Sequence, residues 1–65
     1  MKYWFTIHGS LPEDVSRKLW DKIAPFNANL TVLWDKTYIY GDTDQDTVYQ
    51  ILVEAVGMGY RVERG

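Results

Sequence analysis

Three acidic residues at alternate positions, Asp42, Asp44 and Asp46, are the first feature of this sequence that could do chemistry. Oxygen ligands at positions 1, 3 and 5 open an EF-hand calcium loop, which also needs glycine at position 6 and glutamate at position 12. The sequence has Thr47 and Val53 at those two places. Since acidic residues are also favoured where a helix begins, we interpret the aspartates as helix-start residues and expect neither a metal site nor a cofactor.

His8 is the single histidine, and the chain contains no cysteine. A zinc site needs several such ligands at suitable spacing, and none accompanies His8. A histidine-containing catalytic triad would need Ser10 or Ser16 as its nucleophile, but Ser10 precedes a predicted helix and Ser16 lies on the surface of that helix. We therefore expect no catalytic residues and no enzymatic activity.

A predicted strand and helix position these residues. Residues 2–8 are almost all aromatic, β-branched or apolar, as is typical of a strand, and Gly9 ends it. Ser10 and Glu13 have the spacing of a capping box, which predicts the start of a helix. The helix then carries apolar residues one turn apart, namely Val15, Leu19 and Ile23.

A hairpin is predicted over residues 30–41, with its turn at Asp35 and Lys36. That turn would pair Leu33 with Tyr38, Val32 with Ile39 and Thr31 with Tyr40. A second helix follows, with apolar residues at helical spacing: Val48, Ile51, Leu52, Ala55 and Val56. Gly57 supplies a left-handed helix stop, and residues 60–63 alternate like a final strand.

The element order is therefore strand, helix, strand, strand, helix, strand. Right-handed crossovers would put both helices on the same face of the sheet. We predict an α+β fold of the ferredoxin-like split βαβ type, with a four-stranded antiparallel sheet whose first and third strands are central. Its 65 residues are expected to form a single domain, 1–65.

The uncovered sheet face is the predicted binding site. If Phe5 and Ile7 face the helices, alternation places Trp4 on the opposite face. The residues predicted to form the site are Trp4, Thr6, His8, Leu33, Tyr38, Tyr40 and Arg61. Exposed aromatic clusters of this kind mark interaction sites. We therefore predict a small protein-interaction module that forms a homodimer through this face.

Two alternatives stay open. In RNA-recognition modules of this fold, aromatic residues on the first and third strands stack on single-stranded bases, so an RRM-like platform is one alternative. The other is an ACT-like regulatory domain that binds a small ligand near Gly9 and Ser10. A net charge of -2 disfavours nucleic acid. Since no apolar run approaches the roughly 20 residues of a membrane span and no signal segment is evident, we expect no membrane partner and a cytoplasmic location.

Overall fold

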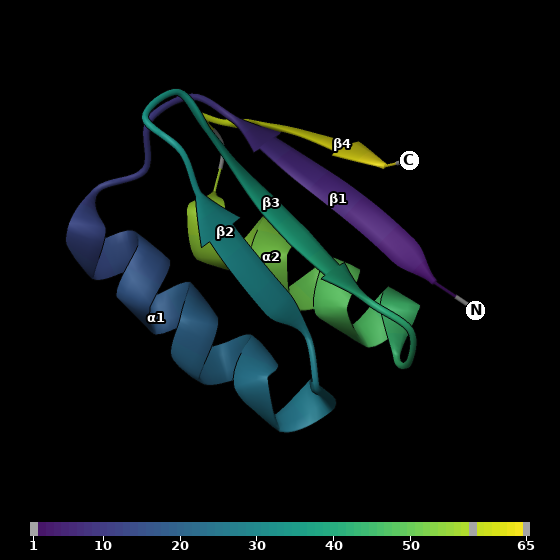
Figure 1. The fold of residues 1–65 in the computed structure, drawn as a ribbon. Coiled ribbons are helices and arrows are strands. Elements are labelled where there is room, and N and C mark those ends of the chain that lie inside the picture. Colours follow the sequence, from purple (N-terminus) through teal and green to yellow (C-terminus); the bar gives the residue numbers. More distant parts are fainter. Residues whose placement is uncertain (1, 58, 65) are drawn as a thin grey trace.

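The strands and helices follow the predicted order in the computed structural model, which describes residues 2–57 and 59–64 (Figure 1). The elements are β1 (Tyr3–His8), α1 (Glu13–Ile23), the short 3-10 helix η1 (Ala24–Phe26), β2 (Asn29–Val32), β3 (Lys36–Gly41), α2 (Gln45–Val56) and β4 (Arg61–Arg64). The sheet order is β2-β3-β1-β4, and each neighbouring pair is antiparallel. This is the predicted ferredoxin-like arrangement, with both helices on one face and β1 and β3 at the centre.

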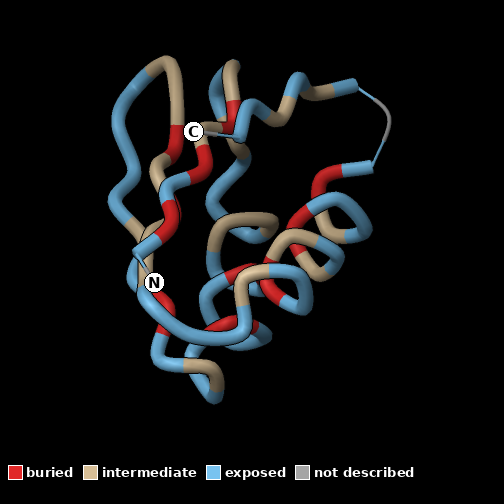
Figure 2. The backbone as a smooth tube through the Cα atoms, turned by 90° about the vertical axis from the view of Figure 1, so that its right-hand side faces the viewer, coloured by how far each residue is buried: buried red, intermediate tan, exposed pale blue. Residues whose placement is uncertain are grey.

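The core lies between the helices and one face of the sheet. Buried positions alternate with intermediate or exposed ones along β1 and β3 (Figure 2). Phe5, Ile7 and Ile39 are fully buried, whereas Trp4 is 44% exposed, so the predicted facing of the first strand is confirmed. The helices contribute Leu19 and Ile23 from α1 and Val48, Leu52 and Val56 from α2. Full burial of each large apolar side chain stabilises the fold by about 1.5–3 kcal/mol.

The predicted capping box at the start of α1 is wrong. The helix begins at Glu13, its cap position is Pro12, and no side chain caps it. Pro12 has the extended φ and ψ of a residue outside the helix, so the turn starts too late for Ser10 to reach the first amides. The carbonyl of Ser10 instead accepts a hydrogen bond from the Tyr60 hydroxyl at 3.2 Å. Glu13 pairs with Arg17, 2.7 Å away on the next turn.

The hairpin turns one residue earlier than predicted. Val32 lies opposite Thr37 and Leu30 opposite Ile39, and the Leu33 amide donates to the Lys36 carbonyl at 2.8 Å. The turn is therefore at Trp34 and Asp35. Moving a two-residue turn by one position changes every cross-strand partner by two, which preserves the face of each side chain. In this register Leu30 lies opposite Ile39 and packs against the core, which favours this register over the predicted one.

The ends of α2 lie where they were predicted, but their geometry differs. Asp44 is the cap residue and Asp46 lies in the first turn, so two of the three aspartates are helix-start residues. Asp44 adopts a left-handed conformation, with φ 58°, and its side chain makes no capping hydrogen bond. At the other end Gly57 has φ 65° and ψ -153°, a conformation that glycine adopts at little cost but not the predicted left-handed helical one. Its amide donates to the Val53 carbonyl and ends the helix.

The buried hydroxyl of Thr37 allows a test of how polar groups affect the stability of the core. Its side chain is fully buried on the helix-covered face of β3, and its hydroxyl has no hydrogen-bond partner among the described residues. A buried hydroxyl without a partner costs about 1–3 kcal/mol. We expect Thr37→Val, which keeps the shape and removes the hydroxyl, to raise the free energy of unfolding by about 1 kcal/mol. For a domain of this size the melting temperature should rise by about 4–8 °C.

The matched control is Thr37→Ser, which keeps the hydroxyl and removes the methyl group. It should lower stability, because it loses apolar contact and retains the polar cost. Urea unfolding measured by tryptophan fluorescence gives both values. A Thr37→Val protein less stable than the wild type would show that the hydroxyl finds a partner in solution.

Candidate functional site

The sheet face turned away from the helices carries the candidate site. We call it the open face and define it by the outward residues of the four strands: Trp4, Thr6, His8, Asn29, Thr31, Lys36, Tyr38, Tyr40, Arg61 and Glu63. Six of the seven residues predicted for the binding site belong to it. The register of β1 against β3 and β4 brings them together, because Trp4 lies opposite Tyr40 and His8 opposite Arg61.

Three aromatic rings form the centre of the open face. The rings of Trp4 and Tyr40 are stacked, with centroids 5.2 Å apart and an interplanar angle of 17°. Tyr38 lies on the diagonal and is tilted against Trp4, with centroids 5.1 Å apart. Each such pair contributes about 0.5–1.5 kcal/mol beyond the area that it buries. The three rings therefore support one another, yet Trp4 remains 44% exposed.

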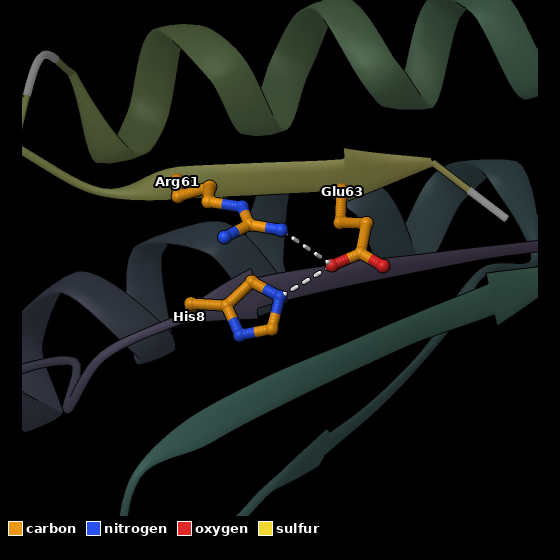
Figure 3. Close-up of polar contacts among 3 residues, drawn as sticks. All are labelled: His8, Arg61 and Glu63. Carbon is orange, nitrogen blue, oxygen red and sulfur yellow. Dashed lines mark hydrogen bonds and ion pairs between the residues drawn. The ribbon is translucent and has the colours of Figure 1, made fainter.

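A polar cluster lies beside the rings, on β1 and β4. Figure 3 shows the carboxylate of Glu63 between His8 and Arg61. The His8 Nε2–H donates to Glu63 Oε1 at 2.8 Å, and the Arg61 guanidinium lies 3.3 Å from the same oxygen. All three side chains are substantially exposed, so these contacts add little to stability. They bring one carboxylate next to an imidazole and a guanidinium at the rim.

The contacts in this cluster lower the pKa of the Glu63 carboxyl. The hydrogen bond from His8 is the main cause of its lowered pKa, and the charges of His8 and Arg61 act in the same direction. A carboxylate with a lowered pKa on an open surface stays ionised and is suited to pairing with a cation. It lacks the enclosed setting that raises the pKa of a general acid.

Leu33 is the one predicted site residue that the structure places elsewhere. Because β2 ends at Val32, Leu33 lies beyond the strand, beside the hairpin turn, and is 41% exposed. The earlier turn also moves Lys36 into β3 and onto the open face. Its ammonium group lies 6.0 Å from the centre of the Tyr38 ring. A turn predicted one residue earlier would have placed Lys36 in the strand, opposite Leu33 beside the turn.

The corner proposed for a small ligand is occupied by contacts within the fold. The Gly9 amide donates to the Asp35 carbonyl at 2.8 Å, which ties β1 to the hairpin turn. The Ser10 carbonyl accepts from Tyr60, as described above. Within residues 2–57 and 59–64, no three His, Cys, Asp or Glu side chains are grouped so that they could hold a metal ion. No helix in the same ranges is long and apolar enough to cross a bilayer.

No protein-family model matches this sequence, and no curated protein matches it either. The function therefore has to be inferred from the chemistry of the open face.

The lowered pKa of Glu63 can be tested directly. We expect His8→Ala to raise the pKa of the Glu63 carboxyl toward its ordinary value of 4.5, because the main hydrogen bond is lost. Arg61→Ala should raise it less, since the Arg61 charge is the smallest of the causes. NMR titration of the side-chain carboxyl carbon measures both values.

The lowered pKa of Glu63 makes folding stability depend on pH, and proton linkage gives the direction of that dependence. A carboxyl with a lower pKa in the folded state contributes stability above the unfolded value of about 4.5 and loses it as the pH falls through the folded value. The wild type should therefore lose slightly more stability than His8→Ala across that acidic range. A larger pKa change in Arg61→Ala than in His8→Ala would contradict this account.

Proposed function

We propose that this protein is a non-enzymatic protein-interaction module that self-associates through its open face. The observation that carries the proposal is the central aromatic cluster, in which Tyr38 and Tyr40 hold an exposed Trp4 in a fixed position. Aromatic residues at the centre of a surface with a polar rim supply most of the binding energy in protein interfaces. Because the rings are already packed together, little side-chain entropy remains to be lost on binding.

A second copy of the chain fits this surface. Sheet faces pack on one another at about 10 Å, and a two-fold axis would place the same cluster on both sides of the contact. Arg61, Lys36 and Glu63 supply both signs of charge, so the rim can pair with itself.

The size of the open face limits the strength of the dimer. Strands β1 and β3 have six residues and the edge strands β2 and β4 have four. With about 4.8 Å between strands and about 3.3 Å per residue, the sheet spans at most roughly 20 by 20 Å, or less than about 400 Å² in projection. A stable interface of standard size buries about 800 Å² on each partner. We therefore propose a reversible dimer that forms at high protein concentration.

Single-stranded nucleic acid is the second candidate for the same surface. It is favoured by the location of Trp4, Tyr38 and Tyr40 on the two central strands, as in other base-stacking platforms. The charge counts against it, since Glu63 offsets part of the charge of Lys36 and Arg61.

The test of self-association is the molecular mass measured by light scattering over a concentration series. We expect a mass that rises toward a dimer in the wild type and stays monomeric in Tyr38→Glu, because the two introduced carboxylates would be buried against each other without partners. The matched control is Trp20→Glu. Trp20 is 43% exposed on α1, close to the exposure of Trp4, but lies on the helix side.

Two outcomes would contradict the proposed dimer. A wild type that stays monomeric throughout the series is one. An equal loss of association in Trp20→Glu and Tyr38→Glu is the other, since the contact would then not be specific to the open face. Binding of a fluorescent oligothymidylate whose affinity falls steeply with salt would favour the nucleic-acid candidate.

A further inference from the structure

A groove of about 650 Å³ opens at one end of the sheet, where β1 begins, β2 begins and β3 ends. Figure 1 shows these three strand ends, together with the start of α2, on the same side of the molecule. The volume is within the range of about 300–1,000 Å³ typical of small-molecule sites. The groove adjoins the open face and shares Trp4 and Tyr40 with it, but it extends beyond the sheet to residues that no part of the proposed dimer uses.

One wall of the groove is aromatic. The stacked rings of Trp4 and Tyr40 line it, and their interplanar angle of 17° makes them nearly parallel. Aromatic rings of this kind offer a flat apolar surface with a partial negative charge on its face. Such a surface fits the C–H groups of a saturated ring, whose hydrogens carry a slight positive charge.

The rest of the lining is rich in amides. Asn27, Asn29 and Gln45 come from three different segments and all line the groove. An amide side chain carries both donors and an acceptor, so it matches a hydroxyl group, which is also both. No hydrogen bond to another described side chain engages these three amides. They are therefore available to a ligand with several hydroxyl groups.

Tyr3 provides a second, independent indication of a ligand. Its side chain is 6% exposed and lines the groove, and its hydroxyl has no hydrogen-bond partner among the described residues. The hydroxyl lies so close to Gly41 that a Cβ at that position would be 2.6 Å from it. Burial, helped by the charges of Asp42 and Asp44, raises the pKa of Tyr3, so the group remains a protonated donor. A ligand hydroxyl that came within reach of it, beside Gly41, would supply the missing partner.

The described lining of the groove carries charges of both signs. Asp42 and Lys2 line it, and the charge of Asp44 acts on Tyr3. Neither sign dominates this lining, so the ligand class is set by its amides, which match hydroxyl groups, and by its aromatic rings, which match an apolar ring face.

We propose that this groove binds a neutral polyhydroxylated ligand with an apolar face, of the size of a monosaccharide or disaccharide. The ring of the ligand stacks on Trp4 and Tyr40, and its hydroxyl groups bond to Asn27, Asn29 and Gln45. This proposal does not depend on self-association, because Tyr38, the residue whose substitution is expected to disrupt the dimer, does not line the groove.

The test is an NMR titration of the folded protein with cellobiose and maltose, followed by backbone and side-chain amide signals. We expect saturable shifts at Asn27, Asn29, Gln45 and the Trp4 indole for at least one of these sugars. Gln45→Ala should weaken that binding by about tenfold, corresponding to the loss of about 1.4 kcal/mol. Gln50→Ala is the matched control, because Gln50 is on the same helix but its amide contacts Glu54, outside the groove. It should bind as the wild type does.

Repeating the titration at a protein concentration at which light scattering gives the monomer mass separates this site from the dimer. Sugar binding by the monomer supports the groove whether or not the wild type self-associates at higher concentration. The proposal is overturned if neither sugar shifts the groove residues, or if Gln45→Ala and Gln50→Ala bind equally well. It is also overturned if the groove responds to inorganic phosphate or L-phenylalanine but to neither sugar, since the ligand would then be charged.

Discussion

Two short helices can cover only one face of a four-stranded sheet, and the rest of this structure follows from that limit. Helices α1 and α2 have 11 and 12 residues, so each is about 16–18 Å long. Packed side by side at about 10 Å, they cover one face of the sheet and none of the other. With no cysteine to add a covalent constraint, the core must be complete on that single side. Phe5, Ile7 and Ile39 achieve this as fully buried residues of the central strands.

Because the helices cover only one face of the sheet, β1 has one buried side and one side that is partly exposed. Its inward positions are as buried as any in the molecule, and its outward positions carry Trp4, Thr6 and His8. The protein reduces the exposure of Trp4 by packing Tyr38 and Tyr40 against it, and it borders the cluster with the exposed ion pairs around Glu63. The edge strands β2 and β4 have four residues each, which limits strand pairing at the edges with other chains. The open face is therefore better suited than the sheet edges to contact with another chain.

The open face and the groove share one aromatic surface. Trp4 and Tyr40 belong to both, whereas Tyr38 belongs to the open face and the amides of Asn27 and Gln45 belong to the groove. A ligand stacked on the shared rings would compete with a second copy for the same apolar area. The two proposals are thus physically linked, although each depends on residues that the other does not use.

The sequence by itself determined the fold class and the facing of the central strands. Alternation in β1, which separates Phe5 from Trp4, and the apolar spacing of α2 are local signals, since they depend only on which residue types can be buried together. They were sufficient to predict the ferredoxin-like topology and six of the seven residues expected on the open face. The position of the hairpin turn and the assembly of the groove depend on distant segments, so only the tertiary structure decided them. The hairpin turn moved to Trp34 and Asp35 because Leu30 packs in the core, and the groove combines residues from β1, β2, the end of β3 and the start of α2. Periodicity sets which side of an element is buried, but long-range packing sets the register and assembles the site.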